Sequence, residues 1–158
     1  MSVEEWALVA CVAFAGVWAG LTGMLTLVMH PMLRDMEGPA FTRFLHVFLP
    51  VARKAWFNWV CVLGLIFSPA VALWTLDTDS TAFTFTLFGF LLTIIGPLLT
   101  SNRLAEPNYD VILGWNPDAL PDDWERVKGR YFAYNWIRFA CTLGAFALFI
   151  AALLDLLG

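Results

Sequence analysis

Charged residues are scarce in this chain of 158 residues, and their scarcity excludes most soluble proteins. Asp, Glu, Lys and Arg make up 14% of the sequence and hydrophobic residues 60%, against about 25% and about 45–50% in soluble domains. Three stretches, 6–29, 55–76 and 81–101, contain no charged residue, and 131–154 contains only Arg138. A helix of about 20 residues crosses the hydrocarbon core of a bilayer. The sequence therefore predicts an all-α fold: an integral membrane four-helix bundle forming one transmembrane domain.

Cysteine, histidine and cofactor-binding motifs are also scarce. The three cysteines fall in different apolar stretches without a C-x-x-C pair, which is typical of small packing residues. His30 and His46 are the only histidines, and the apolar stretches contain no Asp or Glu, so a dedicated metal site lacks ligands. No dinucleotide, phosphate-loop or G-x-S-x-G motif occurs. We expect no bound cofactor and no nucleic-acid partner, with haem on His30 and His46 as the alternative.

Basic residues indicate the orientation in the membrane. The connections 31–54 and 102–130 hold four Lys or Arg residues each, whereas the connection 77–80 holds two Asp residues and no base. Basic residues in short loops stay on the cytoplasmic side. We therefore expect a multi-pass protein of a bacterial inner membrane, with both termini outside the cytoplasm.

Both basic connections contain further helical signals. Apolar residues recur at helical spacing from Phe41 to Leu49, and Pro50 follows them, which predicts a short interfacial helix lying on the cytoplasmic leaflet. In the second connection, Asp122 and Glu125 have the spacing of a capping box. A helix is expected to start there and to continue into the fourth span.

Polar residues near the cytoplasmic ends of the four spans are the candidate functional residues. Unpaired polar groups are costly in hydrocarbon, so those that occur there often have a function. They form one layer because alternate spans run in opposite directions: His30, Asn58, Asn102, Arg103, Asn135 and Arg138. Asn135 and Arg138 continue a helical face that includes Trp124 and Tyr131. The layer predicts a polar pocket among the helices, although Arg138 could instead extend to lipid head groups.

The order of these residues resembles the anthrone-oxygenase-like family of small four-span membrane proteins. The resemblance covers nearly the whole chain and rests on His30-Pro31 after a glycine-rich span, Trp56-Phe57, Thr100-Ser101-Asn102-Arg103, Trp124, and Tyr134-Asn135-Trp136-Ile137-Arg138. Asn102, Asn108, Trp124, Asn135 and Arg138 follow the order of the family's third loop and last helix. The spacing between Asn102 and Asn108 differs from the family's pattern, so either one can match its asparagine.

The resemblance implies a cofactor-independent oxygenase. Characterised fungal members oxidise an anthrone to an anthraquinone without metal or flavin, whereas most bacterial members have no assigned activity. Such a reaction needs a base, a donor for the developing oxyanion and a dry cavity. The hypothesis assigns His30 as the base and Arg138 with Asn135 as oxyanion stabilisers. The expected substrate-binding residues are Asn58, Asn102, Arg103, Asn108, Trp124 and Tyr131.

Two alternatives to an enzyme remain at this stage. The same pocket could bind a quinone, a lipid or another hydrophobic small molecule without chemistry, or the protein could be an accessory subunit of a membrane complex. Expected partners are membrane lipid, a hydrophobic small molecule and, for an oxygenase, dioxygen. Gly16-x-x-x-Gly20 could pack against the fourth span or against a second copy in a homo-oligomer.

Overall fold

The computed structural model describes residues 2–158, and helices account for nearly all of them. The expected all-α fold is confirmed, because the only β-type contact in this range is an isolated bridge between Asn116 and Ala119. The helical segments are α1 (Val3–Gly23), η1 (Met24–Met29), α2 (His30–Asp35), α3 (Gly38–Lys54), α4 (Trp56–Thr75), α5 (Thr81–Thr93), η2 (Ile94–Ala105), α6 (Glu106–Leu113) and α7 (Trp124–Leu157).

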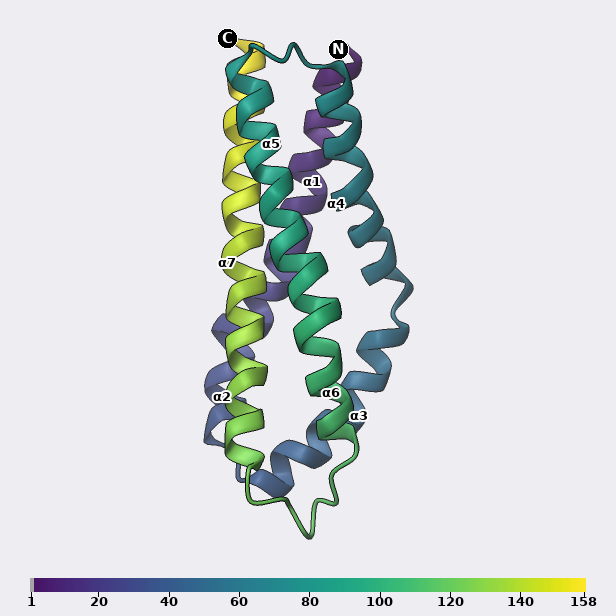
Figure 1. Ribbon diagram of the computed structural model, residues 1–158, viewed down its shortest axis with the longest axis vertical. Helices are drawn as coiled ribbons and strands as arrows, with labels where there is room; N and C mark the ends of the chain where they lie inside the picture. The colour runs from purple at the N-terminus through teal and green to yellow at the C-terminus, as the bar shows by residue number, and fades with distance from the viewer. Residues whose placement is uncertain (1) are drawn as a thin grey trace.

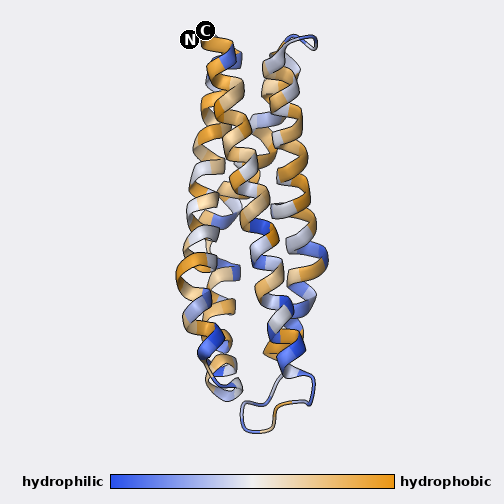
Figure 2. Ribbon diagram, turned by 90° about the vertical axis from the view of Figure 1, so that its left-hand side faces the viewer, coloured by the Kyte–Doolittle hydropathy of each residue, from blue (hydrophilic) through white to orange (hydrophobic). Residues whose placement is uncertain are grey.

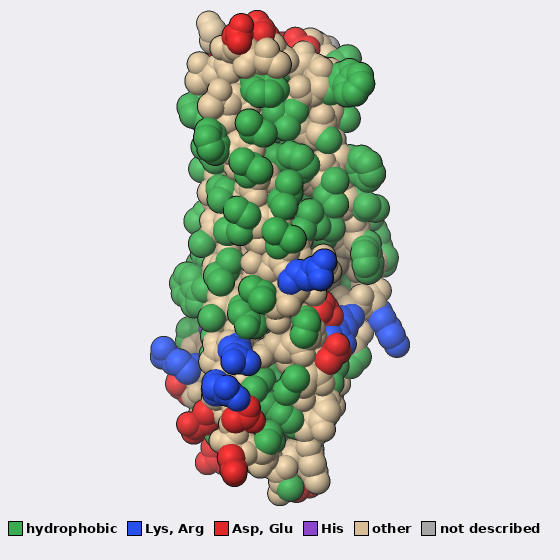
Figure 3. All heavy atoms as spheres, in the orientation of Figure 1, with side chains coloured by type: hydrophobic (Ala, Val, Ile, Leu, Met, Phe, Trp, Pro, Cys, Tyr) green, Lys and Arg blue, Asp and Glu red, His purple; other side chains and the backbone are tan. Residues whose placement is uncertain are grey.

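Several segments join end to end, so the bundle consists of four long helical rods. They are Val3–Asp35, Trp56–Thr75, Thr81–Leu113 and Trp124–Leu157, and each is long and apolar enough to cross a membrane. Hydrophobic side chains cover much of the visible surface, Lys and Arg side chains gather toward one end, and acidic side chains lie at both ends (Figure 3). The protein is therefore a multi-pass membrane protein with a four-helix bundle fold.

The two ends of the bundle differ in composition. We call the end with both chain termini and the α4–α5 turn the terminal half, and the end with α2, α3, α6 and the α6–α7 connection the loop half (Figure 1). The ribbon is mostly hydrophobic through the terminal half and becomes mixed in the loop half (Figure 2). A separate hydrophobic cluster of buried residues lies in each half.

The first and third rods are longer than the sequence predicted. The first continues through Pro31 to Asp35, and the third continues from Asn102 to Leu113. A proline inside a helix loses a hydrogen bond and clashes with the preceding turn. Here π-helical segments, η1 before Pro31 and η2 around Pro97, widen the helix instead of ending it.

Helix α3 forms where the sequence predicted a short helix, but its surroundings differ from the prediction. Its apolar face does not lie on lipid: Phe41 and Leu45 are fully buried in the protein, and Leu49 is 3% exposed. They pack with residues of α6 and α7 such as Ile112. Pro50 lies inside the helix rather than ending it, and α3 is thus part of the loop half.

Helix α7 confirms the prediction that the last span begins well before residue 131. It runs without a break from Trp124 to Leu157. The predicted capping box of Asp122 and Glu125 is wrong, because the N-cap residue is Asp123 and no side chain caps the helix. Asp123 instead pairs with Arg126 one turn later, at 2.6 Å.

Small residues let the helices approach closely in the terminal half. A Cβ atom added to Gly89 would lie 2.6 Å from the Phe149 ring, and one added to Gly96 would lie 2.5 Å from Cys141 Cβ. The two glycines of Gly16-x-x-x-Gly20 differ. A Cβ atom added to Gly16 would lie 2.9 Å from the Phe146 ring of α7, whereas one added to Gly20 would have no neighbouring atom within 4 Å. Of these two glycines, only Gly16 packs against the fourth span.

Candidate functional site

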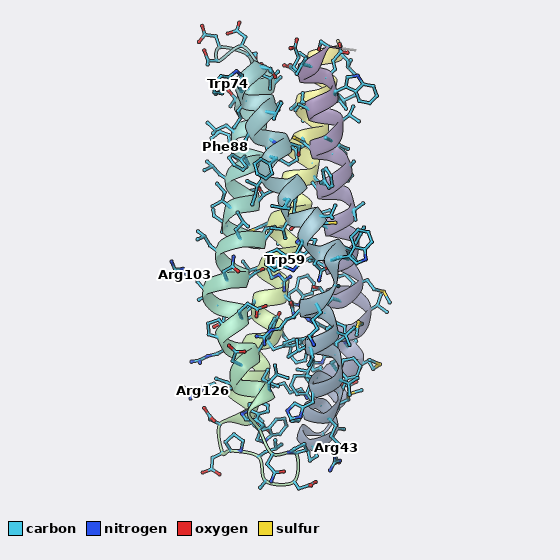
Figure 4. All side chains as sticks on the ribbon, turned by 90° about the vertical axis from the view of Figure 1, so that its right-hand side faces the viewer. Arg43, Trp59, Trp74, Phe88, Arg103 and Arg126 are labelled. Atoms are coloured by element: carbon cyan, nitrogen blue, oxygen red, sulfur yellow. The ribbon has the colours of Figure 1, made fainter. Side chains whose placement is uncertain are left out.

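A cavity of about 810 Å³ lies where the two halves of the bundle meet. Its lining comes from α1, η1, α3, α4, η2, α6 and α7, and most of the lining side chains are apolar. Trp59, which lies near the middle of the bundle in Figure 4, is one of them. A space of this volume is within the usual range for a small-molecule site, about 300–1,000 Å³.

Two backbone features form this space. At Ala55 the chain is extended, with ψ of 108°, and this break separates α3 from α4 at the outer edge of the bundle (Figure 1). Across the cavity, the π-helical turns of η2 carry Pro97, Ser101 and Asn102 on its wall. Such segments often occur at functional sites because the wider turn redirects side chains.

Arg138 lies in a polar cluster on the cavity wall. Its Nη1 donates to the Tyr109 hydroxyl at 3.1 Å and to Asn135 Oδ1 at 3.2 Å. The Tyr109 hydroxyl also lies 3.5 Å from Asn135 Oδ1, and the guanidinium carbon is 6.0 Å from the centre of the Trp18 ring. Arg138 therefore points into the bundle and does not extend to lipid head groups.

Arg53 is a second arginine on the cavity wall, and two carboxylates balance its charge. Its Nη2 lies 2.7 Å from Glu106 Oε2 and 2.8 Å from Asp110 Oδ1, which ties α3 to α6. Burial alone would lower the pKa of Arg53, but the two carboxylates outweigh it and hold that pKa above its ordinary value. The guanidinium also lies over the Tyr109 ring, at 5.9 Å.

Some polar atoms of the lining residues have no hydrogen-bond partner within residues 2–158. They are Trp18 Nε1, Arg53 Nε, Ser101 Oγ, the Tyr131 hydroxyl and Arg138 Nε, all of them shielded from solvent. Buried polar groups are nearly always hydrogen-bonded in native proteins, so each exception needs an explanation. A bound molecule that accepts hydrogen bonds would be one.

His30, the predicted base, is not among the residues that line the cavity. It is 5% exposed, and its ring packs against Phe132 at 4.7 Å and Tyr131 at 5.9 Å between centroids. Neither ring nitrogen has a hydrogen-bond partner in the described part of the chain. Tyr131 itself does line the cavity, so His30 is adjacent to the wall without forming it.

The other predicted binding residues separate into two groups. Asn58 and Asn102 line the cavity with Tyr131, and Asn58 Nδ2 donates to the Ala52 carbonyl at 2.8 Å beside the α3–α4 break. Three lie elsewhere. Asn108 is buried and donates to the Val127 carbonyl, Trp124 packs over Gly38 at the start of α7, and Arg103 is exposed and points away from the bundle (Figure 4).

Sequence reasoning missed several lining residues, above all Trp18, Arg53 and Tyr109. Arg53 and Tyr109 were assigned to loops, whereas the helices continue through both positions. The signal for α6 was present, because Ala105, Tyr109 and Ile112 recur at helical spacing and all three are buried. Trp18 lies inside an apolar span, and no charged residue occurs near it in the sequence to mark it as part of a site.

His, Cys, Asp and Glu side chains do not form a group of three or more that could hold a metal ion anywhere in residues 2–158. His46 Nε2 lies 3.0 Å from the Ile112 carbonyl oxygen, so this histidine joins α3 to α6.

Comparison of the chain with family models, with curated proteins and with solved structures finds no match.

Proposed function

We propose that this membrane protein binds an apolar aromatic or quinone-type small molecule in the 810 Å³ cavity. The observation that carries the proposal is the combination of a mostly apolar wall with one polar cluster, in which Arg138 donates to Tyr109 and Asn135. Apolar walls bind the body of such a molecule, and a few placed polar groups orient it. An oxygen of the ligand would accept hydrogen bonds from this cluster.

The charge distribution supports a cytoplasmic position for the loop half, as part of the same proposal. Eight of the nine Lys and Arg residues lie in the two connections at that end, and none lies in the α4–α5 turn. Under the positive-inside rule both termini would lie outside the cytoplasm, and the location we propose is a bacterial inner membrane. The ligand would be bound near the cytoplasmic boundary of the bilayer.

A second candidate function is a cofactor-independent oxygenase that acts on an anthrone-like molecule in the same cavity. Its support is the resemblance in sequence and the position of Arg138 and Asn135, which suits a developing oxyanion. In the reaction, dioxygen provides one atom for the new carbonyl, and the other leaves as water with the two methylene hydrogens. His30 does not line the cavity, and the lining carboxylates Glu106 and Asp110 are paired with Arg53.

The binding proposal is tested by filling the cavity. We would titrate the protein in mild detergent with menadione and follow the quenching of tryptophan fluorescence. Ser101→Phe adds a ring to the cavity wall and is expected to weaken binding by at least about tenfold, which corresponds to about 1.4 kcal/mol. Leu99→Phe is the matched control, because Leu99 is 52% exposed on the same helix and does not line the cavity.

Equal quenching of wild type and both variants would refute the binding proposal. The oxygenase is tested separately, by dioxygen uptake with anthrone as substrate. Uptake above the rate without protein, lost in Ser101→Phe and kept in Leu99→Phe, is the expected result for an oxygenase. Normal binding without uptake would refute the second candidate and leave the first intact.

A further inference from the structure

The two arginines on the cavity wall differ in how their charge is balanced. Arg53 contacts two carboxylates, Glu106 and Asp110, within 2.8 Å. Arg138 has no Asp or Glu oxygen within 4.0 Å among the described residues, and its partners, Tyr109 and Asn135, are neutral. A cation inside a membrane-spanning helix is costly without an opposite charge.

Arg138 also has donor capacity that the protein does not use. Its Nε is buried and has no partner within residues 2–158, and the same holds for Trp18 Nε1. Trp18 is 95% buried on α1 and lies beside the guanidinium, 6.0 Å from ring centre to carbon. Ser101 Oγ on η2 is another polar atom of the cavity wall without a partner. Unpaired donors of α1, η2 and α7 therefore line the same cavity.

We infer that the ligand of this cavity is an apolar molecule that carries one anionic oxygen, such as a phenolate, an enolate or a carboxylate, and that this oxygen is the counter-charge of Arg138. The inference rests on the proposed function and adds the charge state of the ligand to it. An anionic acceptor satisfies the unpaired donors and balances the charge at the same time, whereas a neutral ligand does only the first.

The anionic oxygen could come from a free aromatic acid or from the phosphate of an anionic lipid. Arg138 lies 19 residues before the last residue of α7, Leu157, which is about 28 Å along the helix. The hydrocarbon core is about 30 Å thick, so the guanidinium is close to the depth that a lipid phosphate reaches. Both sources provide the same chemistry, and the experiment separates them.

The test compares a charged and a neutral probe built on the same ring. Pentachlorophenol is ionised at neutral pH, whereas its methyl ether, pentachloroanisole, has the same ring and cannot ionise. Binding is measured by tryptophan quenching in nanodiscs of phosphatidylcholine, with wild type, Arg138→Met and Arg130→Met. Arg130 is the matched control because it is an exposed arginine of the same helix outside the cavity.

We expect wild type and Arg130→Met to bind the phenolate at least about tenfold more tightly than the ether, as a charge-assisted hydrogen bond allows. Arg138→Met should bind both probes equally. Adding phosphatidylglycerol to the nanodiscs separates the sources: weaker phenolate binding in wild type identifies an anionic lipid as the competing ligand, and unchanged binding identifies a free aromatic acid.

Equal binding of phenolate and ether by wild type would overturn the inference. That result would leave the proposed function intact, because the ether would still bind in the cavity. Loss of both probes, with no effect of Ser101→Phe on either, would refute the proposed function instead. The comparison within wild type does not depend on whether Arg138→Met folds.

Discussion

The terminal half and the loop half of the bundle are built on different principles. Buried residues of the terminal half are mostly apolar and often small, such as Ala15, Cys61 and Ala145, and its helices touch through glycines. Its buried polar side chains are hydroxyls such as that of Thr86, which donates within its own helix. The loop half buries polar and charged groups as well, including Lys128 and Asn135, and the cavity opens beside it. Close packing fixes the helices in one half, so the other can keep an open space and unpaired donors.

The largest effect should follow from breaking the packing of the terminal half. Phe149 is fully buried and lies against Gly89 of α5. Lipid is as apolar as the ring, so Phe149→Ala loses packing rather than solvation, and we expect a loss of about 3 kcal/mol in the free energy of unfolding. The measurement is reversible unfolding in mixed micelles.

Phe88→Ala is the control for that change. Phe88 is 55% exposed on the same helix as Gly89 and points outward (Figure 4), so its removal should change the unfolding free energy little. Menadione binding by the folded Phe149→Ala protein should be unchanged. A loss of stability as large in Phe88→Ala would contradict the packing account of the terminal half.

A smaller effect is expected from a buried charge in the loop half. Lys128 Nζ donates to the carbonyls of Arg34 at 3.0 Å and Met36 at 2.6 Å, where α2 ends. The ammonium group also lies 5.0 Å from the centre of the Phe41 ring. Lys128→Met leaves the two carbonyls without this donor, which should cost about 1–3 kcal/mol.

Cleavage by a protease at the α2–α3 connection measures this loss, and it should become faster in Lys128→Met. Arg126→Met removes a nearby exposed cation whose only ion pair within residues 2–158 is with Asp123, and exposed pairs contribute little. The two variants should therefore differ. If both are cleaved at the rate of wild type, Lys128 does not hold the end of α2.

The smallest effect separates the two glycines that the sequence left equivalent. Gly20→Ala places a methyl group where no atom lies within 4 Å, so the unfolding free energy should change by less than about 1 kcal/mol. Gly16→Ala would place Cβ 2.9 Å from the Phe146 ring and should cost more. A shift from dimer to monomer in Gly20→Ala, seen by light scattering in detergent, would show instead that Gly20 packs against a second copy.

Several residues of the cavity wall could be predicted from the sequence, and the wrong predictions have a common cause. Asn58, Asn102, Tyr131 and Arg138 were predicted from polarity inside apolar spans, and all four line the cavity. His30 is also a polar residue at the end of an apolar span, but it does not line the cavity. Polarity identifies a residue that needs a partner or a function, but not the direction in which its side chain points.

The sequence by itself determined the four membrane-spanning helices, because the hydrocarbon core selects long apolar segments wherever they pack. It also determined that the basic residues gather at one end of the bundle. Only the tertiary structure decided that α3 packs on α6 and that the third helix continues through Tyr109. It also decided that Arg53 contacts carboxylates while Arg138 contacts only neutral groups. These depend on contacts between residues far apart in the chain, which the local pattern of hydrophobicity does not encode.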